Sequence, residues 1–247
     1  MTVPHTRHNK ILCTDLDGTF IGDDSSMYKL LELIDTKGIM LVFSTGRHLP
    51  SLSTFIDEKQ IRRPDICILM VGTEIYVLSN GEFVLDENWK RIISQDWDKD
   101  KIVNMLAGIN ELTLQDEQWQ TEFKASYFLT DNVNEVLHDI DSRMRKAGLK
   151  AQVIYSADQF LDFLPYLSGK AEALKYIADN SAINKENVIV CGDSGNDLDM
   201  FRAGFKGIIV GNAHTELKKY KGENAYHATG EYSAGIIEGL KYFDFIT

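Results

Sequence analysis

The stretch Ile11–Thr19 (ILCTDLDGT) determines the fold that we expect for this chain. Ile11–Cys13 is typical of a short buried strand, and Gly18 permits a sharp turn directly after it. Side chains alternate along an extended segment, so Asp15 and Asp17 fall on the same side of the chain. Two carboxylates so close repel each other unless a cation or a proton lies between them. We therefore expect a divalent metal with oxygen ligands here; the alternative is a solvated turn after a strand.

The composition is that of a soluble globular protein, long enough for one large domain or two unequal ones. The chain has 247 residues, of which 44% are hydrophobic and 26% charged, and a net charge of −11 that argues against nucleic acid as a partner. No apolar run approaches the roughly 20 residues of a membrane-spanning helix, and the N-terminal segment has no apolar signal region. The three cysteines lack zinc-ligand spacing, so we expect reduced thiols in a cytoplasmic protein without a membrane partner.

Strands and helices alternate in the N-terminal part of the chain. Ser25–Lys37 has the apolar spacing of an amphipathic helix, with Ser25 or Ser26 as its N-cap. Apolar runs predict buried strands at Ile39–Phe43 and Ile66–Val71. This order predicts right-handed crossovers and a mainly parallel sheet, in which ligands bind outside the carboxyl ends of the strands. The polar residues expected at that edge are Asp15, Asp17, Thr45, Arg47, Thr73 and Glu74.

From about Glu82 onward, the residue types and the order of the predicted elements differ from those of the preceding part of the chain. All three tryptophans, Trp89, Trp97 and Trp119, lie there, and the order helix, strand, strand occurs twice. This pattern predicts a small α+β insert with its own antiparallel sheet. We therefore expect an α/β core formed by residues 1–80 and 166–247, with a second domain at residues 81–165.

The alternating pattern returns after the insert and brings further polar residues to the same edge. Lys170 begins a helix, and the strand Asn187–Cys191 runs into GDSGND, which contains Asp193 and Asp197. Each of these residues also has a simpler interpretation. Lys170 fits a solvated lysine, the run from Asp193 to Asp197 fits a loop with an N-cap, and Thr45 fits a cap on the following helix. Their joint occurrence at strand ends, in this order, favours one shared site.

These side chains fit phosphoryl transfer, which needs mainly positioning and charge neutralisation. Asp15 fits a nucleophile that forms an aspartyl-phosphate. Asp17 fits an acid that protonates the leaving alcohol and later deprotonates the attacking water. Asp193, with Asp15 and the backbone carbonyl of Asp17, fits a Mg²⁺ site. Lys170 and the Thr45 hydroxyl fit groups that hold phosphoryl oxygens.

The chain resembles the haloacid-dehalogenase superfamily of aspartyl phosphatases over essentially its whole length. The signatures that carry the resemblance are DLDGT (Asp15–Thr19), Thr45, Lys170 and the run Asp193–Asp197. The resemblance implies a Rossmann-like core with a mainly parallel sheet, and a C2-type cap for the insert. It also implies that the first aspartate of DLDGT is the nucleophile and the second the acid/base. The implied Mg²⁺ ligands are Asp15, Asp17, Asp193 and Asp197, the last either directly or through a neighbouring group.

Within that superfamily the chain resembles the sucrose-phosphate phosphatases. The segments that carry this likeness include FSTGR (Phe43–Arg47), VGTEIY (Val71–Tyr76), VIYSADQFLDFLP (Val153–Pro165) and AGIIEGLKYFDF (Ala234–Phe245). The resemblance implies that residues of the cap contact a sugar and that Asn196 contacts the phosphoryl group or the sugar beside it. The substrate-binding residues expected in all are Thr45, Arg47, Thr73, Glu74, Lys124, Tyr127, Asp162, Lys170 and Asn196.

We expect a Mg²⁺-dependent phosphatase that hydrolyses a disaccharide phosphate, such as sucrose 6-phosphate, through an aspartyl-phosphate. The phosphates of mannosylfructose, glucosylglycerol and mannosylglycerate are alternative substrates. A sugar phosphomutase and a non-catalytic sugar-phosphate-binding protein are alternatives on the same scaffold. The expected partners are a small-molecule sugar phosphate and, as a candidate, a sugar-phosphate synthase, with the chain itself a monomer.

Overall fold

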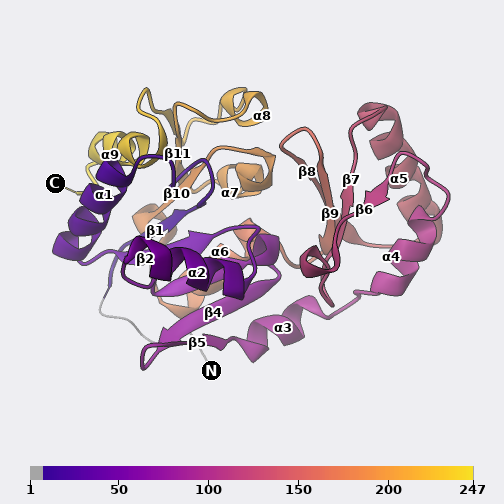
Figure 1. Ribbon diagram of the computed structural model, residues 1–247, viewed down its shortest axis with the longest axis horizontal. Coiled ribbons are helices and arrows are strands. Elements are labelled where there is room, and N and C mark those ends of the chain that lie inside the picture. Colours follow the sequence, from indigo (N-terminus) through magenta and orange to yellow (C-terminus); the bar gives the residue numbers. More distant parts are fainter. Residues whose placement is uncertain (1–7, 247) are drawn as a thin grey trace.

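The strand β1 (Ile11–Thr14) lies in the middle of the larger of two sheets, and all four of its residues are buried. The computed structural model describes residues 8–246. The other strands of this sheet are β2 (Met40–Ser44), β3 (Ile66–Leu69), β4 (Glu74–Ser79), β5 (Glu82–Leu85), β10 (Val188–Gly192), β11 (Lys206–Ile209) and β12 (Ala225–His227). Their order is β12-β11-β10-β1-β2-β3-β4-β5 (Figure 1). Pairing is parallel from β12 to β3 and antiparallel for β4 and β5, so the prediction of a mainly parallel sheet is confirmed.

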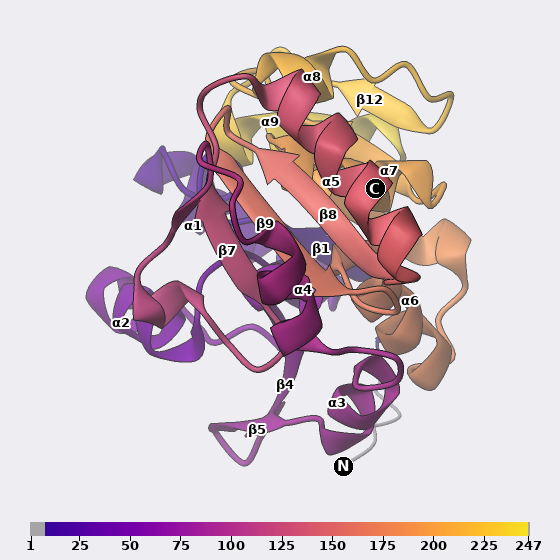
Figure 2. The same cartoon turned by 90° about the vertical axis from the view of Figure 1, so that its right-hand side faces the viewer.

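Helices cover both faces of this sheet. They are α1 (Asp24–Lys37), α2 (Leu49–Lys59), α3 (Glu87–Ile93), α6 (Lys170–Asn180), α7 (Leu198–Arg202), α8 (Thr215–Lys218) and α9 (Tyr232–Tyr242). Figure 2 shows α1 and α2 on one side of the sheet and α6 and α7 on the other. Short 3₁₀ turns occur at η1 (Met70–Gly72), η3 (Lys185–Asn187) and η4 (Gly195–Asp197).

The start of α1 differs from its expected position. The N-cap is Asp23, whose side chain accepts a hydrogen bond from the Ser26 backbone N–H at 2.9 Å, so the expected cap at Ser25 or Ser26 is wrong. A carboxylate accepts from the positive end of a helix more strongly than a hydroxyl does, which explains the choice. The apolar face is as expected from the spacing, with Met27 and Leu30 fully buried.

The second sheet belongs to the insert, which we call the cap. Its strands β6 (Thr113–Leu114), β7 (Ala125–Phe128), β8 (Ala151–Ser156) and β9 (Phe160–Pro165) pair antiparallel in the order β6-β7-β9-β8. The helices α4 (Lys99–Leu106) and α5 (Val133–Ala147) lie on the side of this sheet away from the core, and η2 (Glu117–Trp119) precedes β7 (Figures 1 and 2). The other face of the cap sheet is turned toward the core.

The cap's own elements begin later than residue 81, where the sequence placed the boundary. β5 pairs with β4 at the edge of the core sheet, and Trp89 and Ile93 of α3 pack in the core's hydrophobic cluster. The Trp89 indole also donates to the Gly72 carbonyl at 3.2 Å. The β4–β5 hairpin and α3 therefore extend the core to about Ile93, and α4 is the first helix of the cap.

Candidate active site

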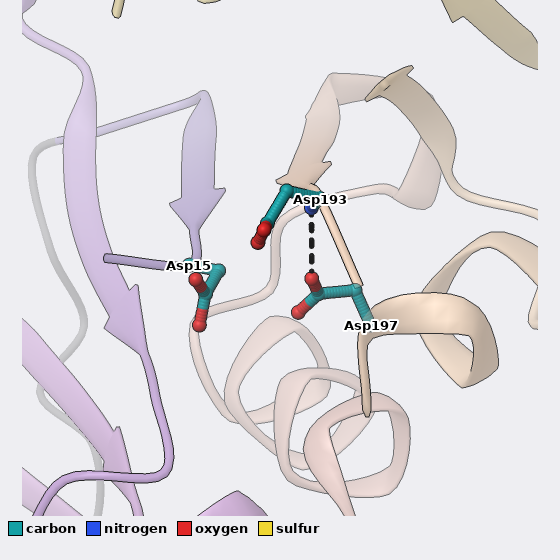
Figure 3. Close-up of side chains that lie close together, drawn as sticks. All are labelled: Asp15, Asp193 and Asp197. Atoms are coloured by element: carbon teal, nitrogen blue, oxygen red, sulfur yellow. Dashed lines mark hydrogen bonds between the residues drawn. The ribbon is translucent and has the colours of Figure 1, made fainter. Parts of the chain in front are cut away.

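Three aspartate carboxylates converge where β1 and β10 end. Asp15 directly follows β1, and Asp193 and Asp197 follow the neighbouring parallel strand β10. All three side chains are buried, and one oxygen from each lies within 4.8 Å of the others (Figure 3). The pairing of Thr14 with Cys191 brings the two strand ends level, which is why residues so distant in sequence meet.

The Lys170 ammonium, in the first turn of α6, lies against these carboxylates. Its Nζ donates to Asp15 Oδ1 at 2.8 Å, to Asp197 Oδ1 at 2.6 Å and to Asn196 Oδ1 at 3.0 Å. Burial by itself lowers the pKa of an ammonium, but Asp15 and Asp197 outweigh burial here and the pKa of Lys170 is raised. The anions that Lys170 contacts therefore favour its charged form at this helix start.

Asp197 has both carboxylate oxygens engaged. Oδ1 accepts from Lys170, while Oδ2 accepts from the backbone N–H groups of Asp193 at 3.0 Å and Ser194 at 3.1 Å. One side chain thus fixes both the lysine and the loop that carries Asp193.

The charge balance of this cluster fits a bound divalent cation. Three buried aspartates contact or surround one ammonium, which leaves excess negative charge away from water. Burial, opposed by Lys170, raises the pKa of Asp15 well above its usual range. Burial and the Asp197 charge raise the pKa of Asp193 to about 6. Carboxylate oxygens are ligands that Mg²⁺ prefers, so Asp15 and Asp193 have the donor chemistry for it.

The Asp17 side chain lies outside the carboxylate cluster. Arg47 binds it with two hydrogen bonds, Nε to Oδ2 at 2.7 Å and Nη2 to Oδ1 at 2.5 Å, and the Asp17 side chain is 57% exposed. The hydrogen bond from Arg47 to Asp17 raises the pKa of the guanidinium. Arg47, expected to bind substrate, contacts the expected acid/base instead, although both residues border the cavity described next.

A cavity of about 350 Å³ lies over the cluster, between core and cap. Its volume is within the range of small-molecule sites. The core contributes Asp15, Asp17, Thr45, Arg47, Asp193 and Asn196 to its lining, and the cap contributes Gln115, Trp119, Lys124, Phe128, Phe160 and Asp162. The structure therefore brings most of the expected site residues to a single cavity.

The cap wall of this cavity holds a buried ion pair. Lys124 Nζ lies 3.1 Å from Asp162 Oδ1, which also accepts from the Ser126 hydroxyl at 2.6 Å. Ser126 and Asp162 are directly opposite each other in β7 and β9, so their side chains share the face toward the core. Paired charges of this kind are suited to hydrogen bonds with sugar hydroxyls.

Four expected substrate-binding residues do not line this cavity. One of them, Lys170, lies behind the lining and reaches the site through its contact with Asp15. Tyr127 lies on the opposite face of the cap sheet, in the cap's hydrophobic cluster, with its ring edge-on to Phe163 at 6.0 Å. Strand alternation explains this, because neighbours of Ser126 must point away from it. Thr73 and Glu74 line a separate cavity of about 80 Å³, next to Trp89 of α3.

Several residues that line the cavity between core and cap were not predicted from the sequence. Phe128 and Phe160 share a face with Ser126 and Asp162, so strand alternation starting from the predicted Asp162 would have found them. Trp119, in the η2 turn, carries no periodic signal. The other lining residues that were not predicted are Gly46, Val71, Gln115, Ser156, Ala157, Ser194 and His214.

A mainly parallel α/β core, a cap inserted into it, and buried aspartates and a lysine under the cap define a phosphatase of the haloacid-dehalogenase superfamily. A family model for sucrose-6F-phosphate phosphohydrolase matches residues 8–244. The chain belongs to this family, and it is a phosphoric monoester hydrolase acting on sugar phosphate.

Solved and curated relatives agree with this placement. The X-ray structure of the sucrose-phosphatase from Synechocystis sp. PCC6803, in complex with sucrose and phosphate, has a TM-score of 0.90 and 30% identity, and the match covers 97% of this chain and 100% of that chain. The mannosylfructose-phosphate phosphatase of Agrobacterium fabrum is 32% identical over 241 residues, 95% of this chain and 96% of the relative. Sucrose-phosphatase 1 of Nicotiana tabacum is 31% identical, and the match spans 95% of this chain but 59% of the tobacco protein.

None of the helices between residues 8 and 246 is both long enough and apolar enough to cross a membrane.

Proposed function

We propose that this chain is a Mg²⁺-dependent phosphatase of a disaccharide phosphate, with sucrose 6-phosphate as its substrate. The observation that supports this most is one cavity with the Asp15–Asp193–Asp197–Lys170 cluster on its core side and the Lys124–Asp162 pair on its cap side. The cluster suits a phosphoryl group and the pair suits a sugar. The similarity to a sucrose-phosphatase solved with sucrose and phosphate adds to this support.

In this proposal Asp15 is the nucleophile. One of its carboxylate oxygens bonds to phosphorus while the bond from phosphorus to the sugar oxygen breaks. Asp17, at the edge of the cavity, leaves Arg47, takes up a proton and gives it to the departing sugar oxygen. The carboxylate then accepts a proton from the water that hydrolyses the aspartyl-phosphate. Lys170 and the Thr45 hydroxyl neutralise and orient the phosphoryl oxygens.

Asp15 and Asp193 would hold Mg²⁺, together with the backbone carbonyl of Asp17. The cation would balance the aspartates and withdraw charge from the phosphoryl oxygens. Because both oxygens of Asp197 already accept hydrogen bonds, we assign it a supporting part through Lys170 and the loop.

Replacing the nucleophile tests the chemistry directly. Asp15→Asn should abolish phosphate release, because an amide forms no acyl-phosphate, and should leave the fold intact since the amide is of equal size. Phosphate release with Mg²⁺ and the far-ultraviolet circular dichroism spectrum are the measurements. Asp57→Asn, on the exposed side of α2, is the matched control and should behave as the wild type. Steady phosphate release by Asp15→Asn would contradict the mechanism.

A substrate screen tests the narrower assignment. Phosphate release should be measured with the phosphates of sucrose, mannosylfructose, glucosylglycerol and mannosylglycerate. Mannosylfructose phosphate is the second candidate, because its phosphatase from Agrobacterium matches this chain over nearly its full length. If sucrose 6-phosphate is not among the best substrates by kcat/KM, the sucrose assignment fails. An isomerised sugar phosphate as the product would identify a mutase, and binding without turnover a non-catalytic protein.

The monomeric state, the synthase partner and the cytoplasmic location stay predictions from the sequence.

A further inference from the structure

Glu216 of α8 links the cap to the loop that carries Asp193 and Asp197. Its Oε1 accepts hydrogen bonds from the Gly195 backbone N–H at 2.8 Å and from the Ala157 backbone N–H at 3.3 Å. Gly195 lies between Asp193 and Asp197, whereas Ala157 follows β8 at the tip of the β8–β9 hairpin of the cap. One carboxylate oxygen therefore holds a segment of each domain.

The hairpin and the loop also touch each other directly. A Cβ at Gly195 would lie 2.8 Å from the Tyr155 carbonyl oxygen and 2.9 Å from Glu216 Oε1. Contacts this short essentially do not occur for a real Cβ, so space alone requires glycine at this position. The close approach is thus independent evidence that the cap rests on this loop.

The backbone of the hairpin tip, one of the two partners of Glu216, has a conformation that needs support from its surroundings. The hairpin tip has two consecutive non-glycine residues in the left-handed region, Ala157 at φ 51° and Asp158 at φ 55°. On the other side, α8 is tied to the loop by a bond from the His214 N–H to the Asp193 carbonyl at 2.7 Å. Glu216 is therefore fixed relative to the loop and presents its carboxylate to the hairpin.

We propose that Glu216 is a positioning residue that couples the seating of the cap to the geometry of the Asp193–Asp197 loop. Ser156 and Ala157 of the hairpin and Ser194 and Asn196 of the loop line the same cavity, so a shift of the hairpin moves both walls together. Glu216 is not among the lining residues and acts through these two segments. Only the kinetic consequence of this link rests on the proposed function.

Amide hydrogen exchange of the substrate-free protein tests the link itself. Removing the shared acceptor in Glu216→Ala should raise exchange at Ala157 and Gly195 together, by about tenfold, since hydrogen bonds to a charged group are among the stronger ones. Glu216→Gln keeps an oxygen acceptor and should restore most of the protection. Glu223→Ala, at an exposed glutamate before β12, is the matched control. Unchanged exchange in Glu216→Ala, or a change at one of the two amides alone, overturns the proposal.

Kinetics with two substrates separates positioning from a general loss of structure. Glu216→Ala should raise KM for sucrose 6-phosphate about tenfold, with a smaller change for p-nitrophenyl phosphate, which has no sugar for the cap to hold. Equal changes for both substrates, with a lower Tm, would show a merely structural role and overturn the proposal. If the wild type hydrolyses no sugar phosphate, the proposed function fails, while the exchange experiment still decides on Glu216.

Discussion

Asp199 is a partly buried carboxylate that braces the start of α6, next to Lys170. Its Oδ2 accepts from the Ala171 backbone N–H at 3.0 Å, while its Oδ1 is buried without a hydrogen-bond partner in the described part of the chain. Burial is the main reason that the pKa of Asp199 is raised from 3.8 to about 6. A helix start favours an anion, yet here the desolvation of the carboxylate outweighs that effect.

The contribution of Asp199 to the stability of the metal-free protein should fall as pH rises from about 4 to about 6. In this window native Asp199 keeps its proton while the unfolded chain has released it, so raising the pH favours unfolding. The contribution is full below the unfolded pKa and is lost as pH passes the native one, a change of about 3 kcal/mol. Asp193, with its raised pKa, acts in the same direction.

Urea unfolding in EDTA at about pH 4.5 and about pH 7 measures this dependence. Asp199→Asn should have a smaller difference between the two conditions than the wild type, because the amide does not titrate. An identical pH dependence in the two proteins would contradict the assignment to Asp199.

At the scale of elements, the contact between η1 and the start of α6 sets the position of Lys170. Gly72 has φ +96°, and a Cβ there would lie 2.2 Å from the Gly169 carbonyl carbon and 2.6 Å from the Lys170 nitrogen. The backbone of η1 therefore lies directly against the turn that begins α6. No side chain intervenes between the two segments.

Gly72→Ala should destabilise the protein by more than about 3 kcal/mol, since backbone atoms would have to separate. It should also lower kcat, because the displaced turn carries Lys170. Gly81→Ala is the control: Gly81 has φ +84° and open space around its Cβ position, so only the backbone conformation costs energy, about 1 kcal/mol. Urea denaturation of both variants makes the comparison, and equal losses would show that the close contact has no effect of its own.

How far the sequence predicts these elements depends on burial. β1 and β10 are buried throughout and read as continuous apolar runs, so the aspartates that follow them could be predicted. β5 is the edge strand and β4 is its neighbour, and both are only partly buried, so the sequence signal for the end of the core sheet is weaker there. The Arg47–Asp17 pair and the position of Trp119 depend on tertiary contacts, for which a single sequence carries no periodic signal.

At the scale of the whole molecule, the cap rests on the core at two separated places. Phe123, from the loop before β7, packs in the core's hydrophobic cluster, and Lys90 of α3 pairs with Glu122 at 3.0 Å. The β8–β9 hairpin rests on the loop after β10 through Glu216. The cavity lies between core and cap, and in the proposed function its core wall would act on the phosphoryl group and its cap wall would select the sugar.

Asp162→Asn should separate these two tasks. The amide leaves Lys124 without its counter-ion, so KM for the disaccharide phosphate should rise by about tenfold or more, as expected for a buried charged hydrogen bond. The kcat/KM for p-nitrophenyl phosphate should change by less than about threefold, because that substrate needs only the core wall. Asp139→Asn, which breaks the exposed Asp139–Arg143 pair on α5, is the matched control. A parallel loss with both substrates would argue against sugar selection by the cap.

The position of β10 between β11 and β1 has a consequence for synthesis on the ribosome. The emerging chain forms β1 to β5 first, and β1 then has a neighbour only on its β2 side until the cap and α6 have been translated. An apolar strand edge left open in this way is a template for pairing with other nascent chains. The aspartate after β1 likewise acquires its lysine counter-ion only after the cap has been translated, so the cluster of Asp15 and Lys170 forms late in synthesis.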